Sequence, residues 1–227
     1  MFDLSSGLTM IGLDVLMIAF TAWALSLNNT KGKPIALVSA GLLTWLVLLH
    51  LGLSNEALFP PDVTGPVFFG VILLAVALVG LLLLAVPPVR RLLLGLDQRQ
   101  LLLLQGIRVF FGATFLMQAS LGVLPQTFGI LDGFTHIGAG FFGLVAAFSV
   151  AAGVHGVRRA WFANLFGLAD ILIVASTLAL VLLPQIGPHH SMMYAVLLPA
   201  PLWLWFHLVS IWKLLRMAHP VNAPSLA

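Results

Sequence analysis

The sequence contains no cysteine and few charged residues. Only 7% of its 227 residues are Asp, Glu, Lys or Arg, whereas a water-soluble domain carries about a quarter. The chain is therefore not a soluble domain. Its net charge of +3 reflects membrane topology, so no nucleic-acid partner is expected. Without cysteine, the chain forms no disulfide, thiolate metal site or covalent c-type haem.

Common catalytic motifs are absent as well. The sequence holds no HExxH, no GxSxG and no phosphate-binding glycine loop. Seven-helix zinc hydrolases such as ceramidases carry an HxxxH pair in their last span, but here Ile211 stands four residues after His207. A retinal protein needs a lysine in the middle of that span, and Lys213 lies at its end. A non-enzymatic function is therefore favoured.

Hydrophobic residues make up 61% of the chain and form seven long runs. About 20 apolar residues are needed to cross the hydrocarbon core of a bilayer as a helix. Proline, glycine and asparagine separate the runs, for example at Pro60–Pro61, Pro87–Pro88 and Pro184. We predict one all-α domain, 1–227, that crosses the lipid bilayer seven times. The predicted spans are 8–27, 35–53, 67–86, 101–123, 128–153, 161–183 and 192–214.

Charge indicates the orientation of these spans. The basic residues fall in or beside alternate loops and the C-terminal tail: Lys31, Lys33, Arg90, Arg91, Arg99, Arg158, Arg159, Lys213 and Arg216. The opposite loops and helix mouths carry only acids: Asp3, Glu56, Asp62 and Asp132. Because positive loops stay inside, the N-terminus is predicted to lie outside and the C-terminus in the cytoplasm.

The span 128–153 carries an acid and an imidazole on one face, because Asp132 and His136 are four residues apart. Small residues at Gly129 with Gly133, and at Ala139 with Gly143, have the spacing that lets membrane helices pack closely. Ionisable residues within a span are costly and commonly functional. The alternative is that Asp132 caps the start of the helix.

Depth along the predicted spans sorts the polar residues into two layers. The outer layer holds Asp14, His50, Gln118, Asp132 and His136; the inner layer holds Gln105, Arg108, Asn164, Asp170 and His207. A buried Arg108 needs an acidic partner, and Asp170 is the acid at similar depth. We predict an Arg108–Asp170 pair, supported by Asn164 and Gln105, that fixes helix packing. A role in gating or binding, and the contacts of His207, stay open.

The outer layer is the better candidate for chemistry. Asp132, His136, His50 and Asp14 could form a proton relay or a ligand site, since imidazole titrates near neutral pH. Histidine and carboxylate also suit a metal ion. The weak metal candidates are His50, His136, His189 and His190, the last two beside Met192–Met193. His50 and His136 could alternatively hold a b-type haem.

Several segments resemble an uncharacterised family of small bacterial multi-pass inner-membrane proteins. They are Gln105-x-x-Arg108, Gly122–Pro125, the glycine-rich span 128–153, Asn164–Asp170 and the closing His207. The resemblance covers roughly the last four spans and implies location in the bacterial inner membrane. It implies no activity. The chain departs from the pattern at His136, where an acid after glycine is more usual.

Three kinds of function therefore stay open. The first is a transporter-like protein that binds a small ligand or ion from the outer side. The second is a membrane redox protein that binds haem b or quinone. The third is a non-catalytic subunit that docks in a larger membrane complex, or a homo-oligomer, and uses its polar groups for packing alone.

Replacing Arg108 by leucine is expected to destabilise the protein, because Asp170 would be left as an unpaired buried charge. Adding Asp170→Asn should recover part of the loss, since the two residues are coupled. Thermal unfolding of both variants in detergent measures this. A single variant as stable as the wild type would contradict the buried pair.

Overall fold

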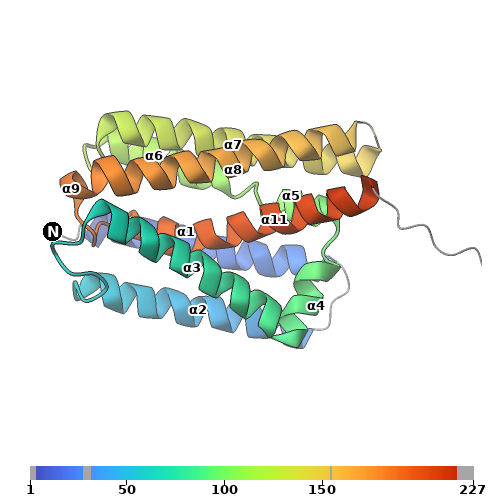
Figure 1. The fold of residues 1–227 in the computed structure, drawn as a ribbon, viewed down its shortest axis with the longest axis horizontal. Helices are drawn as coiled ribbons and strands as arrows, with labels where there is room; N and C mark the ends of the chain where they lie inside the picture. The colour runs from blue at the N-terminus through green and yellow to red at the C-terminus, as the bar shows by residue number, and fades with distance from the viewer. Residues whose placement is uncertain (1–3, 28–31, 154, 219–227) are drawn as a thin grey trace, which may run out of the picture.

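The computed structural model describes residues 4–27, 32–153 and 155–218. Every regular element in these ranges is helical. Seven helices or nearly continuous helix series are long and apolar enough to cross a membrane. They run lengthwise in one bundle (Figure 1). The described part of the chain therefore has seven candidate membrane spans, the number that the hydrophobic runs predict.

Five long helices lie close to their predicted positions in the sequence. The N-terminal part supplies α1 (Leu4–Ser26), α2 (Gly32–Ser54) and α3 (Gly65–Ala85). The later part supplies α7 (Gln126–Ala152) and α8 (Gly156–Thr177). A further helix, α4 (Pro87–Gly95), begins at the two prolines that were expected to mark a break. Proline suits the first turn of a helix, where no backbone N–H is needed.

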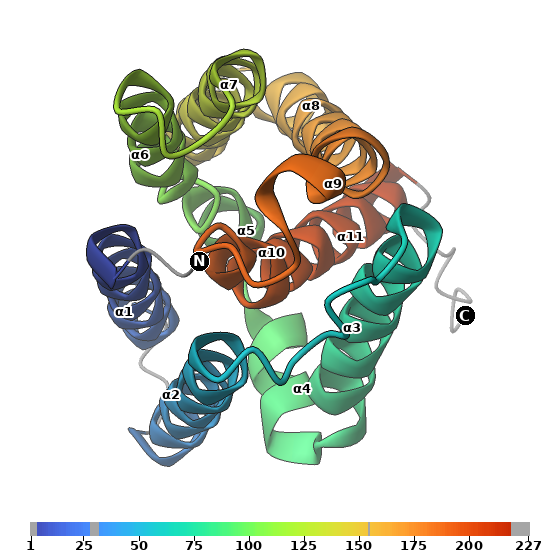
Figure 2. The same cartoon turned by 90° about the vertical axis from the view of Figure 1, so that its left-hand side faces the viewer.

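Two of the seven spans are discontinuous, and these two are the most buried. One consists of α5 (Gln98–Leu103) and α6 (Arg108–Ser120), and the other of α10 (Met193–Leu197) and α11 (Pro199–Ala218). These spans are 61% and 67% buried, against 11% for α2. Viewed along the bundle, α5, α10 and α11 lie at the centre with the other helices around them (Figure 2).

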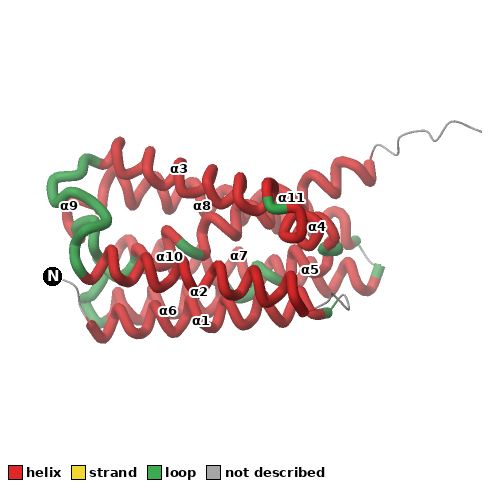
Figure 3. The backbone as a smooth tube through the Cα atoms, turned by 90° about the horizontal axis from the view of Figure 1, so that it is seen from below, coloured by secondary structure: helices red, strands yellow, loops and turns green. Residues whose placement is uncertain are grey.

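The breaks in these two spans correct the prediction of continuous helices over 101–123 and 192–214. Between α5 and α6 the chain tightens into short turns, in which Gln105 N pairs with Leu102 O and Arg108 N pairs with Gln105 O, both at 3.1 Å. Between α10 and α11, Pro199 and Pro201 lack the N–H groups of a regular helix. Figure 3 shows loop segments inside the bundle as well as at its ends.

Pro184 does not end the sixth span, contrary to its prediction as a break. From α8 the helix widens into a π-helical turn, η1 (Leu178–Leu182), and continues as α9 (Leu183–Ile186). Proline is tolerated because it stands in the first turn of α9. The series ends at Gly187, whose φ of +74° favours glycine.

Glycines let α7 approach α5 and α6 closely. A Cβ atom on Gly133 would lie 3.0 Å from Gly112 O, and one on Gly143 would lie 3.0 Å from Leu102 O. A Cβ on Gly129 would lie 3.1 Å from Phe115 O. The Gly129–Gly133 spacing singled out in the sequence therefore faces α6, and backbones meet along this line.

Replacing Trp45 by phenylalanine is expected to destabilise the fold. The Trp45 indole Nε1 donates to Leu197 O at 2.9 Å, and in a regular helix that carbonyl would accept from residue 201, which is proline. Loss of the donor should cost about 1–3 kcal/mol of unfolding free energy. Thermal unfolding in detergent tests this. The control is Trp23→Phe, which should change stability less, because this indole is similarly exposed and its N–H makes no hydrogen bond in the described part of the chain.

Candidate functional site

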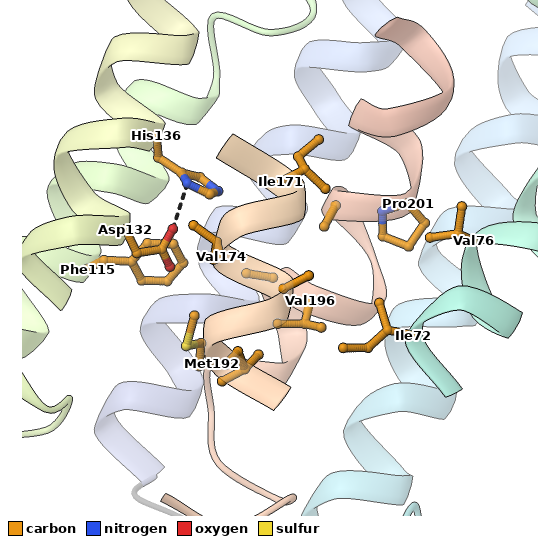
Figure 4. A pocket seen from close by; sticks show the side chains of 14 residues that line it. Ile72, Val76, Phe115, Asp132, His136, Ile171, Val174, Met192, Val196 and Pro201 are labelled. Atoms are coloured by element: carbon orange, nitrogen blue, oxygen red, sulfur yellow. Dashed lines mark ion pairs between the residues drawn. The ribbon is translucent and has the colours of Figure 1, made fainter. Parts of the chain in front are cut away.

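Two carboxylates and one imidazole converge inside the bundle. His136 Nδ1 lies 2.7 Å from Asp132 Oδ1 and 3.2 Å from Asp170 Oδ2. Asp132 and His136 are one turn apart on α7 (Figure 4), and Asp170 comes from α8. All three residues are buried. Neither oxygen of Asp132 has a well-aligned hydrogen bond in the described part of the chain, although Oδ1 is at ion-pair distance from His136.

Arg108 is the buried cation next to this group. It is the first residue of α6, so the break after α5 directs it into the bundle. Its Nη2 pairs with Asp170 Oδ2. Its Nη1 lies 3.2 Å from His207 Nε2 and 3.4 Å from Gln105 Oε1. The guanidinium carbon also lies 5.1 Å from the ring centroid of Trp203, within the range of a cation–π contact.

The contacts of His207 define its tautomer. Asn164 donates its amide N–H groups to Ala160 O at 2.8 Å and to Ser210 Oγ at 2.7 Å. Its oxygen therefore accepts from His207 Nδ1 at 2.9 Å. The lone pair of Nε2 is left to accept from Arg108. His207 is thus a neutral acceptor that completes the surroundings of Arg108.

Hydrogen bonds extend from this histidine toward one end of the bundle. Ser210 Oγ, which Asn164 contacts, also accepts from Gln98 Nε2 at 2.5 Å. Gln98 is the first residue of α5. A connected row of polar side chains therefore leads from the converging acids to the end where α5 begins.

The structure joins the two predicted layers into one network. Asp132 and His136 were placed in an outer layer, separate from the Arg108–Asp170 pair, but His136 contacts Asp170 directly. One reason is that α7 begins at Gln126, two residues before its predicted start. The observed start of α7 therefore lies about 3 Å farther out than the predicted start, and His136 lies deeper below the helix end by the same amount. The N-cap alternative for Asp132 is wrong, because Pro125 occupies that position.

The other predicted site residues lie elsewhere. His50 Nδ1 is 2.7 Å from Tyr194 Oη, and Asp14 is buried on α1. His189 Nε2 accepts from Phe59 N at 3.2 Å, and His190 Nδ1 accepts from Met192 N at 3.1 Å, so both histidines hold loop backbone.

Of the four weak metal candidates, only His136 belongs to a group of three metal-ligating residues in the described part of the chain. The structure brings together Asp132, His136 and Asp170, whose ligand-type atoms lie within 4.8 Å of one another.

A small apolar cavity adjoins Asp132 and His136 (Figure 4). Its walls include Ile72, Val174 and Val196. The cavity volume is about 50 Å³, enough for a few water molecules but far below the roughly 300 Å³ or more of typical cofactor sites. His50 is not among the residues that line it. The residues present do not fit a haem held between His50 and His136.

Several residues that contact the candidate site residues were not predicted from the sequence. Tyr194 is the only tyrosine of the chain, and this rarity is a signal that could have drawn attention to it. Ser210 stands three residues after His207, on the same helix face. Gly167 on α8 leaves room for the His207 imidazole. This contact could not be predicted, because it depends on which helix packs against Gly167.

The fold and the site define a class: an all-helical bundle, with seven helices long enough to cross a membrane and a buried cluster of ionisable side chains in its interior. Within that class, the chain belongs to the family described as Domain of unknown function (DUF8737), which matches residues 66–215. No curated protein and no solved structure matches the chain. The matched region contains the whole Arg108 network and leaves α1 and α2 outside.

Replacing Gly167 by alanine is expected to disturb the network. A Cβ atom there would overlap the His207 imidazole and lie 3.2 Å from Arg108 Nη1. The resulting strain should cost about 1–3 kcal/mol. Thermal unfolding in detergent measures this. The matched control is Gly70→Ala, where a Cβ meets no atom within 4 Å. Equal stability of both variants would contradict the predicted clash.

Proposed function

We propose that the chain is a multi-pass protein of the bacterial inner membrane that binds a proton at Asp132, His136 and Asp170, from the outer side, as a step in transport. Seven long apolar helices support insertion in a bilayer. Large apolar side chains exposed along them, such as Leu81, Leu82 and Phe148, would contact lipid.

The distribution of charge supports an outside N-terminus. Arg90 and Arg91 lie on α4, and Arg99 lies on α5. Both helices are at the end of the bundle opposite to α9 (Figure 1). Glu56 and Asp62 stand between α2 and α3, at the α9 end. By the positive-inside rule, the α4 end is cytoplasmic. Lys31 and Asp3, which also carried this prediction, lie outside the described residues.

Charge balance carries the proposal for the site. Arg108 offsets one of the two carboxylates, so the buried group lacks one positive charge. A buried unpaired charge is strongly unfavourable, and a proton on His136, between Asp132 and Asp170, supplies what is missing. A divalent ion would bring one charge too many while Arg108 stays on Asp170. A proton is therefore the ligand that this site fits best.

The place of the site in the fold supports transport. His136 lies about 15 Å from the start of α7, near the middle of that helix. Both discontinuous spans adjoin it, since Arg108 opens α6 and the cavity reaches Val196 on α10. Secondary transporters place their ion sites at midplane beside broken helices. The row of polar groups that ends at Gln98 leads from the site toward the cytoplasmic end, which is the direction in which a bound proton would leave.

The alternatives have less support. A haem or quinone site needs more room than the cavity beside His136 offers. A subunit that only packs against partners would not need a buried site whose two carboxylates are short of one positive charge.

Proton uptake into liposomes tests the proposal. The protein is reconstituted in liposomes that contain a pH-sensitive dye, and a potassium diffusion potential makes the interior negative. Wild-type protein should acidify the interior, and Asp132→Asn should slow uptake at least tenfold, since it removes one carboxylate beside His136. The control is Asp62→Asn, an exposed loop acid, which should retain uptake. Wild-type uptake no faster than in protein-free liposomes would overturn the transport function.

Nitrogen-15 NMR of labelled histidines tests the binding step separately. One imidazole, lost in His136→Gln, should be charged at neutral pH in the wild type and become neutral in Asp132→Asn. A neutral His136 in the wild type would contradict proton binding at this site.

A further inference from the structure

A second buried carboxyl group lies outside the network described above. Asp14 on α1 is fully buried, and neither of its oxygens has a hydrogen-bond partner among the described residues. None of the ion pairs in the described part of the chain includes it. An ionised carboxylate in such surroundings would be very unfavourable. A neutral carboxylic acid suits this position far better.

The polar neighbours of Asp14 come from α10 and α2. Tyr194 on α10 is close enough to Asp14 to interact with it electrostatically. Its hydroxyl lies 2.7 Å from His50 Nδ1, and the two rings stack with centroids 6.4 Å apart. His50 is half-buried on α2. The Tyr194 hydroxyl can donate or accept a hydrogen bond, and it is not a permanent cation.

The short helix α10 separates this group from the first site. Ala195 and Val196 of α10, with Met192 just before it, line the cavity next to His136. At about 100° per residue, Met192 and Val196 lie on the side of the helix opposite to Tyr194, and Ala195 lies between the two sides. One face of α10 therefore adjoins the Asp132 site and the opposite face adjoins Asp14.

The geometry points to a second proton-binding site, in which Asp14 holds a proton as a neutral carboxylic acid near Tyr194, whose hydroxyl contacts His50. The site is distinct from that at Asp132. Two of its three residues belong to α1 and α2, which the family match does not include.

Buried polar groups lie between Asp14 and the outer end of α1. Ser6 is eight residues before Asp14, about 12 Å along the helix. Its hydroxyl lies 2.5 Å from Ser191 Oγ and accepts from Gln118 Nε2 at 2.9 Å. All three are buried. They place polar atoms on the side from which a proton would arrive.

Infrared spectroscopy of the protein in an alkyl glycoside detergent, which has no carbonyl group, tests this site. A protonated carboxylic acid has a C=O stretch well separated from that of a carboxylate. At neutral pH the wild type should show such a band, and Asp14→Asn should remove it. The controls are Asp132→Asn, at the first site, and Asp62→Asn, in an exposed loop, both of which should retain the band.

The outcomes separate the two proposals. An unchanged spectrum in Asp14→Asn, in protein that elutes as a single folded species, would overturn the second site. Loss of the band in Asp14→Asn alone would support it, even if liposomes showed no proton uptake. The NMR signal of charged His136 should persist in Asp14→Asn, because α10 separates the two sites. Loss of that signal would overturn their independence.

Discussion

The Arg108 guanidinium, fully buried in the interior of the bundle, is the charge on which the surrounding structure depends. An isolated cation there would be prohibitively unfavourable, so every neighbouring element supplies a compensating group. The α8 helix supplies Asp170, α11 supplies the neutral His207 and the face of Trp203, and the turn before α6 supplies Gln105. The position of each helix around the site is consistent with this one requirement.

The break before α6 serves the same requirement. A regular helix would use its backbone groups internally, whereas the turn before Arg108 lets Gln105 reach both the guanidinium and Trp203 O. In an apolar interior, each freed backbone group needs a new partner. Trp45 provides one for Leu197 O from the neighbouring α2. The broken spans are therefore held by side chains of the helices around them.

The number and approximate place of the helices could be predicted, because long apolar runs report directly on helix length. The break at Pro199 and Pro201 was not predicted, because it lies inside an apolar run and proline is tolerated in such helices when neighbours supply donors. Counting residues from the ends of the predicted spans placed Arg108 and Asp170 at the same depth in the membrane. It separated His136 from Asp170, because counting residues along each helix ignores tilt and side-chain reach.

The two groups of acids differ in their position relative to the family match, which leaves out α1 and α2. Arg108, Asp132, His136 and Asp170 all lie within residues 66–215, so every residue of the first site comes from the matched region. Asp14 and His50 lie outside that region, and His50 contacts it at Tyr194 of α10. The five residues of α10 stand between the two acid groups, and Trp45 of α2 donates to Leu197 O at the end of this helix. Because α2 holds α10 in place from one side, the helix keeps the two acid groups apart, which supports independent protonation of the two sites.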